Sequence, residues 1–217
     1  DNISTDNMIR QSLNMIAKFP TIVAYSYQAL RHMFQGKTLS IRHSQPNLST
    51  AENFLYLLKG DCNGFSKIEA DLLDLLLVLH AEHGGGNNST FTMRVTSSSE
   101  TDIYSAITSA IGSLKGPLHG GANVRVLEMM ENIKSNVKDW KDEEEVKAYL
   151  LKILNKQAND FSGKIYGIGH AVYTISDPRA AILKNKAREL AIEKGRLDEF
   201  ELYALVEKIT PEVFRIF

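Results

Sequence analysis

The sequence predicts an all-α fold. Apolar residues recur at helical spacing along most of the 217-residue chain, and no segment alternates apolar and polar residues as a strand does. Capping residues, glycines and prolines separate these periodic segments. Hydrophobic residues make up 43% of the chain and the net charge is -1. That composition is typical of a globular protein with one large or two small domains.

The first fifty residues predict two helices and a loop. Thr5 and Asp6 are suited to cap a first helix, and Pro20 interrupts the apolar period of that helix. A second helix is expected over residues 21–34, with the proline near its first turn, where a missing N–H costs little. Residues 37–48 have no clear period and predict an exposed loop.

Two capping boxes mark the next two helix starts. In residues 49–52 and again in residues 66–69, a serine precedes a glutamate by three positions. The first box predicts a short helix over residues 53–58, and the second a helix that runs to about His80. Apolar side chains cover nearly every face of the second helix, so we expect it to be buried at the centre of the fold.

The segment 100–114 predicts a helix with a small-residue interior. Serine, alanine and glycine recur along it, and small side chains let two helix backbones approach closely. Its partner helix belongs either to the same subunit or to a second one, and the sequence does not favour either.

The last hundred residues predict four more helices. Two are expected over residues 123–135 and 143–155, the second with acidic residues in its first turn, where the helix dipole favours them. A glycine-rich loop follows at residues 163–170. Asp177-Pro178 then opens a helix that Gly195 closes, and a last helix begins near Asp198.

The histidines gather at breaks between predicted helices. His80 and His83 end one helix, while His119 and His170 each lie in a glycine-rich turn. Histidine suits chemistry near neutral pH, and its neutral ring donates to an oxygen that gains negative charge. The alternative is that these histidines only occupy helix–helix turns. A third interpretation, a metal site at His80 and His83, lacks both the zincin spacing and further ligands.

Other functional classes lack their signatures. The basic residues are dispersed among acids, which argues against nucleic-acid binding. No apolar run reaches membrane-spanning length, and the single cysteine, Cys62, fits a reducing cytoplasm. There is no phosphate-loop motif and no nucleophile elbow. The chain starts without methionine and finishes on an apolar dipeptide, so we expect both ends to be cut points.

Three segments together resemble citrate synthase. Residues 80–87, His-Ala-Glu-His-Gly-Gly-Gly-Asn, are similar to the family's His-x-x-His-x-Gly-Gly-Asn. Residues 116–123, Gly-Pro-Leu-His-Gly-Gly-Ala-Asn, resemble its Gly-Pro-Leu-His-Gly-x-Ala-Asn. Residues 167–179 run from Gly-Ile-Gly-His to Asp-Pro-Arg and match its Gly-x-Gly-His … Asp-Pro-Arg. Their order and separations agree with the family through essentially the whole chain.

The resemblance implies a citrate-synthase-like fold that is incomplete here. Residues 1–119 would form part of a large helical domain, and residues 120–217 most of a smaller one. The family is homodimeric, has its active site in the cleft between the domains, and condenses acetyl-CoA with oxaloacetate before hydrolysing citryl-CoA to citrate. Coenzyme A would act as the thioester co-substrate, with no permanently bound cofactor and no metal.

The matched motifs also imply roles for individual residues. His119 would donate to the acetyl carbonyl as the enolate forms, and His170 would polarise the oxaloacetate ketone. The substrate carboxylates would bind to His83 and Arg179, with Asn87 in support. The adenine of coenzyme A would meet the backbone of the loop Ile165, Tyr166, Gly167, Ile168 and Gly169. Thr174 replaces an arginine that some members place near the coenzyme A phosphates, so those contacts do not transfer.

The resemblance places the carboxylate base of the reaction outside these 217 residues. We therefore expect the isolated chain to be inactive, and measurable turnover by it would contradict that expectation. The alternatives are 2-methylcitrate synthase, which uses propionyl-CoA, a citryl-CoA lyase module, and a non-enzymatic interaction domain.

Overall fold

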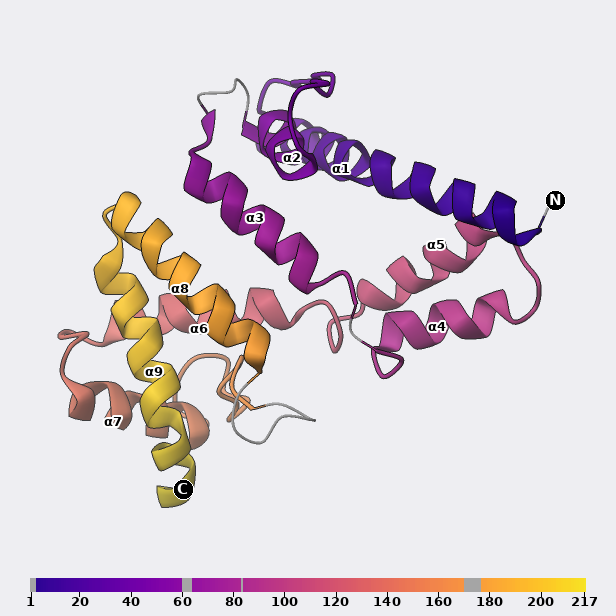
Figure 1. The fold of residues 1–217 in the computed structure, drawn as a ribbon. Coiled ribbons are helices and arrows are strands. Elements are labelled where there is room, and N and C mark those ends of the chain that lie inside the picture. Colours follow the sequence, from indigo (N-terminus) through magenta and orange to yellow (C-terminus); the bar gives the residue numbers. More distant parts are fainter. Residues whose placement is uncertain (1–2, 60–63, 83, 170–176) are drawn as a thin grey trace. The chain divides into compact units, whose positions relative to one another are not determined.

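The fold is all-α, as predicted. The computed structural model describes residues 3–59, 64–82, 84–169 and 177–217, and these ranges contain helices and no strand. The helices are α1 (Thr5–Gln35), α2 (Thr50–Lys59), α3 (Lys67–Leu79), α4 (Asn88–Ser97), α5 (Ile103–Leu114), α6 (Ala122–Asn136), α7 (Glu143–Leu154), α8 (Pro178–Glu193) and α9 (Leu197–Ile216). The chain forms two compact units, Asp1–Ser113 and Leu114–Phe217 (Figure 1).

In the first unit, α1 packs against α2, and α2 against α3. Gln28 on α1 is 3% exposed, and its side-chain nitrogen donates to the carbonyl oxygen of Leu58 at 2.9 Å. Carbonyls in the last turn of a helix have no partner within that helix, so this bond joins α1 to the end of α2. Both predicted capping boxes are present, with the Ser49 and Ser66 amides donating to Glu52 and Glu69 at 2.8 and 2.7 Å.

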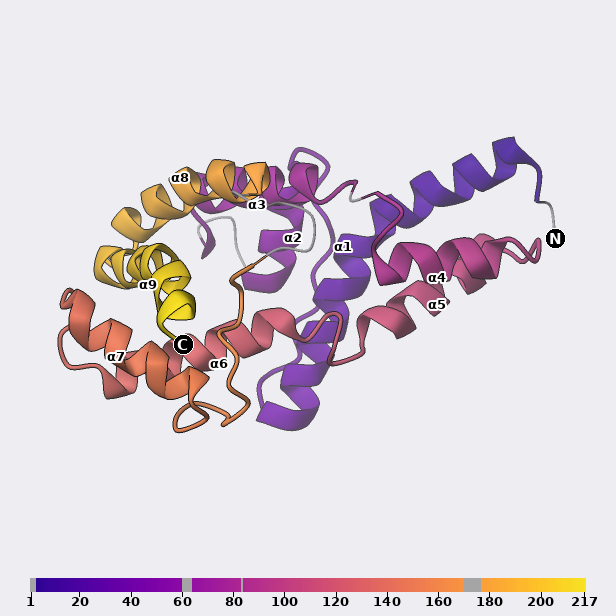
Figure 2. The ribbon, with the colours of Figure 1, turned by 90° about the horizontal axis from the view of Figure 1, so that it is seen from below.

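The prediction of two helices before residue 35 was wrong, because α1 continues through Pro20. Proline removes one hydrogen bond and crowds the carbonyl four residues earlier. Here the helix responds by bending instead of ending, and Figure 2 shows its axis change direction partway along. The burial expected of α3 was also wrong: Ala70 is its one buried residue, while Leu77 and Val78 are exposed.

Helix α4 has no counterpart among the predicted helices. It begins at the cap residue Asn87 and pairs with the small-residue face of α5. The Ser89 hydroxyl donates to the Ala110 carbonyl at 3.0 Å, and the Thr96 and Ser109 hydroxyls lie 2.9 Å apart. The small residues of α5 therefore serve packing within the same unit.

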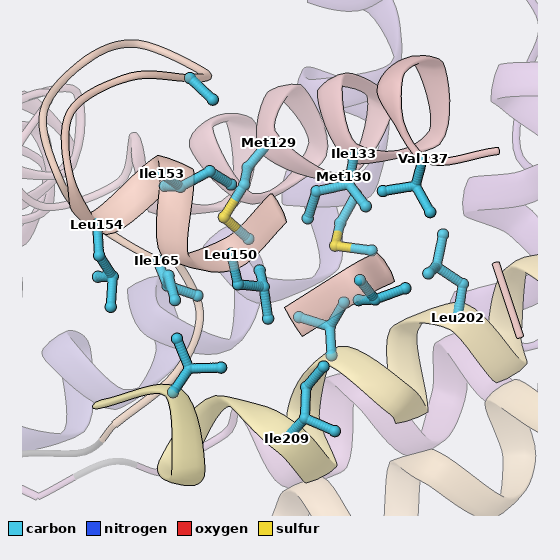
Figure 3. Packing of buried hydrophobic residues seen from close by; sticks show 14 residues of the cluster. Met129, Met130, Ile133, Val137, Leu150, Ile153, Leu154, Ile165, Leu202 and Ile209 are labelled. Carbon is cyan, nitrogen blue, oxygen red and sulfur yellow. The ribbon is translucent and has the colours of Figure 1, made fainter. Parts of the chain in front are cut away.

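The second unit is built on one hydrophobic core (Figure 3). Helices α6, α7 and α9 supply most of its buried side chains, and α8 packs on α9. The Lys134 ammonium on α6 lies 2.9 Å from a Glu199 carboxylate oxygen on α9. The core residues are Met129, Met130, Ile133, Val137, Val146, Leu150, Ile153, Leu154, Ala158, Ile165, Leu202, Val206, Ile209 and Val213.

The helix starts predicted for this unit are confirmed. Asp142 caps α7, accepting from the amides of residues 144 and 145, and Asp177 caps α8 with Pro178 in its first turn. Gly195 follows α8 with a φ of +64°, in the left-handed region that favours glycine at a helix end. Among the described helices, none has both the length and the apolar character needed to cross a membrane.

Candidate functional site

His119 lies on a tight turn that leads directly into α6. Its amide donates to the Gly116 carbonyl at 3.0 Å, and the next amide, of Gly120, donates to the Leu114 carbonyl at 3.1 Å. The side chain of His119 is half-buried, whereas the neighbouring Leu118 is fully exposed. This turn therefore directs the side chain of Leu118 into solvent and keeps the side chain of His119 partly buried.

The two glycines after His119 are required by close backbone contacts. A Cβ atom at Gly120 would lie 2.2 Å from the Leu114 carbonyl oxygen, and one at Gly121 would lie 2.7 Å from that of Pro117. Side-chain carbons essentially never approach backbone atoms so closely. Because these two residues have no side chains, the turn can fold back on the segment before it. This close packing fixes the position of the His119 backbone.

The loop 165–169 rests against α6, one turn beyond its start. Ile165 is buried in the core, and the Tyr166 amide donates to the sulfur of Met129 at 3.3 Å. Gly167 has a φ of +82°, and a Cβ atom there would lie 2.9 Å from a methyl of Val126. The first two turns of α6 therefore carry both the His119 turn and the contacts of this loop.

Arg179 lies at the start of α8, where Asp177 fixes its direction. The Asp177 carboxylate caps the helix by accepting from the Arg179 amide at 2.9 Å. The same carboxylate accepts from the guanidinium, at 3.0 Å from Nε and 2.6 Å from Nη2. Both side chains are about one-fifth exposed. This bidentate pair holds the guanidinium against its own helix end.

Asn87 belongs to the first unit and caps α4. Its side-chain oxygen accepts from the amides of Ser89 and Thr90 at 2.9 and 3.2 Å. His83 and His170, the remaining predicted site residues, lie outside the described residues. In the described ranges, no three histidine, cysteine or acidic side chains gather closely enough to hold a metal ion.

Three residues that contact the predicted site residues were not expected from the sequence in that role. Asp177 was recognised as a helix cap but not as the partner of Arg179. Asp160 and Ser162 contact Tyr166 from the segment before the loop. The sequence carries no signal for them, because residues 155–163 have no regular period. The backbone of that segment is irregular, with positive φ values at Lys156, Asn159 and Phe161, and it carries the Asp160 carboxylate that accepts from Tyr166.

We expect Gly120→Ala in the full chain to lower the unfolding free energy by about 1–3 kcal/mol, because the new methyl group collides with the Leu114 backbone. Gly112→Ala on α5 is the matched control. Nothing lies within 4 Å of a Cβ atom there, so this change should be neutral or stabilise by up to about 1 kcal/mol. Chemical denaturation measures both, and equal stability of the two variants would contradict the packing described for the turn.

The chain is similar to known proteins along nearly all of its length. The family model "Citrate synthase, C-terminal domain" matches residues 1–216. A citrate synthase of Deinococcus radiodurans is 41% identical over 199 residues, covering 91% of this chain and 47% of that protein. A 2-methylcitrate synthase of Shewanella oneidensis is 38% identical over 181 residues, covering 83% of this chain and 43% of that protein.

The fold is shared as well. The crystal structure of citrate synthase from Pyrobaculum aerophilum superposes with a TM-score of 0.68 at 33% identity, covering 87% of this chain and 42% of that one. The chain thus spans about half the length of the relatives it matches. Matches over nearly all of its residues, in sequence and in fold, show that the chain belongs to the citrate synthase family.

Proposed function

We propose that the protein containing this chain is a citrate synthase, which condenses acetyl-CoA with oxaloacetate and hydrolyses citryl-CoA to citrate and coenzyme A. The observation that carries the proposal is the His119 turn. This turn places a half-buried imidazole just before the start of α6. The close backbone contacts of the turn are possible because Gly120 and Gly121 have no side chains. This turn coincides with one of the three motifs that resemble the family.

The chemistry requires a donor at this place. The α-proton of a thioester is too weakly acidic to be removed unless the enolate oxygen meets a preorganised hydrogen-bond donor, which contributes about 3–4 kcal/mol in a site closed to water. The neutral ring of His119 would serve as that donor. A glycine-packed turn suits the role, because a donor that is already in place needs no reorganisation when the charge develops.

The remaining site residues would bind and polarise the second substrate. His170 would donate to the ketone oxygen of oxaloacetate as the new carbon–carbon bond forms. Arg179 and His83 would bind its carboxylates, and Asn87 would support them from the cap of α4. The backbone of loop 165–169 would receive the adenine of coenzyme A, which is a co-substrate; neither a permanently bound cofactor nor a metal is part of the proposal.

The first test is thiol release from acetyl-CoA in the presence of oxaloacetate, measured on the full-length protein. We expect His119→Ala and His170→Ala each to reduce kcat by at least about 100-fold, the cost of losing one such donor. His80→Ala is the matched control, since His80 bonds to its own helix through the Leu76 carbonyl at 2.7 Å and should leave kcat unchanged.

The same assay separates the alternatives. Propionyl-CoA preferred over acetyl-CoA would favour 2-methylcitrate synthase, a function supported here by the Shewanella oneidensis relative. If the protein released thiol from neither thioester, the proposal would be overturned. The remaining alternatives would then be a citryl-CoA lyase module and a non-enzymatic relative.

The role of Arg179 has its own test. Arg179→Lys keeps the positive charge but loses the planar fork of donors, so we expect the KM for oxaloacetate to rise about 10- to 100-fold. Arg188→Lys, on an exposed position of the same helix, is the control and should leave KM within twofold. An unchanged KM in the Arg179 variant would remove this residue from the substrate site.

We further propose that the protein is a homodimer. Helix α1 exposes large apolar side chains along much of its length, and exposed apolar surface of this kind can mark a protein–protein contact. They include Ile9, Leu13, Ile16, Val23, Met33 and Phe34. Light scattering of the full-length protein at micromolar concentration should give twice the mass of one full-length polypeptide. A monomeric mass would contradict the proposal.

A cytoplasmic location is proposed with it, supported by the single cysteine of the chain. Recovery of the protein from a membrane or secreted fraction would contradict that location.

A further inference from the structure

The loop that follows Gly163 cannot owe its shape to its own backbone. Gly163, Gly167 and Gly169 have φ values of +75°, +82° and +92°. Glycine reaches these angles without steric cost, but it also reaches many others, so a loop with three of them has little intrinsic rigidity. The contacts made by the residues between the glycines must therefore determine its shape.

On its inner side the loop is held by apolar contacts with the second unit. Ile165 is buried in the core of α6, α7 and α9 (Figure 3), and Gly167 lies against Val126. The Tyr166 amide bonds to the Met129 sulfur. These contacts fix one face of the loop, and the side chain of Tyr166 also packs against the core as a partly buried residue.

The loop is also held by a polar network of three residues, Asp160, Ser162 and Tyr166. The Tyr166 hydroxyl donates to Oδ2 of Asp160 at 2.6 Å. The Ser162 amide donates to Oδ1 of the same carboxylate at 3.1 Å, and its hydroxyl lies 3.2 Å from the tyrosine oxygen. Hydrogen bonding from the Ser162 side chain, then from Tyr166, with a smaller effect of the Arg125 charge, lowers the pKa of Asp160 to about 2. The carboxylate is therefore ionised at any pH near neutrality and accepts both bonds fully.

The segment that carries Asp160 is wound into an unusual backbone. Lys156, Asn159 and Phe161 all have φ values between +56° and +60°. L-amino acids other than asparagine and aspartate seldom adopt this conformation, and strain of this kind persists where the surrounding structure imposes it, often at functional sites. Asp160 lies between two of these residues, Asn159 and Phe161, and its carboxylate accepts the hydrogen bond from Tyr166.

We propose that Asp160, Ser162 and Tyr166 are positioning residues for the acyl-CoA substrate. Together they fix the backbone of loop 165–169 in the shape that receives the adenine of coenzyme A. The inference rests on the proposed function, and it goes beyond it by assigning a role to the Tyr166 hydroxyl and to two residues outside every family motif named above. None of the three acts on oxaloacetate or on the reacting atoms.

The test compares two tyrosines of the same unit in the full-length protein. Tyr166→Phe removes the bond to Asp160, and we expect it to raise the KM for acetyl-CoA five- to twentyfold. The kcat and the KM for oxaloacetate should stay within twofold. Tyr149→Phe is the matched control: Tyr149 packs against the same core, but its hydroxyl donates to Oδ1 of Asn132 on α6 at 2.7 Å and not to the segment before the loop, so the KM for acetyl-CoA should not change.

A double-variant cycle tests whether the two side chains act through one bond. Asp160→Ala should raise the KM for acetyl-CoA by a similar factor, and combining it with Tyr166→Phe should add little more. Amide hydrogen exchange of residues 165–169 should accelerate in either variant and not in Tyr149→Phe. This second readout requires no catalytic activity.

The outcomes separate the two proposals. Normal thiol release by the parent protein, with an unchanged KM for acetyl-CoA in Tyr166→Phe, would overturn the positioning role and leave the proposed function intact. A rise in KM of the same size in Tyr149→Phe would also overturn it, because the effect would then follow general stability. A parent protein that neither binds coenzyme A nor releases thiol would overturn both.

Discussion

Helix α6 is held against α7 and α9 by a core of buried side chains, and the candidate site of the second unit depends on that packing. Met129, Met130 and Ile133 point from α6 into the core and are almost fully buried. The same helix starts at the His119 turn and receives the loop 165–169 along its first turns. A displacement of α6 would therefore move both the histidine and the loop. Burial of its apolar face, worth roughly 25 cal/mol per Å² of apolar surface removed from water, resists such movement.

Absent side chains matter as much as the buried ones in this unit. Gly120 and Gly121 let the backbone return to within van der Waals contact of the preceding segment, and Gly167 does the same against Val126. Each contact is a steric constraint instead of an attraction, so it fixes position without depending on pH or salt. Polar groups then complete the arrangement, with Asp177 orienting Arg179 and Asp160 orienting Tyr166.

Much of this fold could be predicted from local signals in the sequence. Both capping boxes, the Asp177 cap and the closing glycine at residue 195 act within a few residues, and each was found where the sequence indicated. The errors concern features that depend on distant packing. Pro20 was expected to end a helix, but the helix bends there and continues. The apolar residues on all faces of α3 predicted a buried helix, but most of its side chains are not buried in this chain. Helix α4 was missed because its serines and threonines have weak helix propensity and are stabilised by bonds to α5.

The candidate site shows the same division between local and distant information. Motif and spacing indicated His119, Arg179 and the glycine-rich loop, because turns at helix ends leave a visible pattern. Asp160 leaves none, since its contact with Tyr166 depends on an irregular backbone between them. The roles of all these residues in binding and catalysis stay predictions, and His83 and His170 lie outside the described residues.

In the proposed reaction, the glycine-packed turn places His119 as the donor to a forming enolate. The most direct measurement is a crystal structure of the full-length protein with oxaloacetate and an acetyl-CoA analogue whose thioester sulfur is replaced by methylene. We expect a ring nitrogen of His119 to lie within hydrogen-bond distance, about 2.7–3.2 Å, of the analogue's carbonyl oxygen. An analogue bound with its carbonyl directed to another donor, and with His119 in contact only with protein, would contradict it.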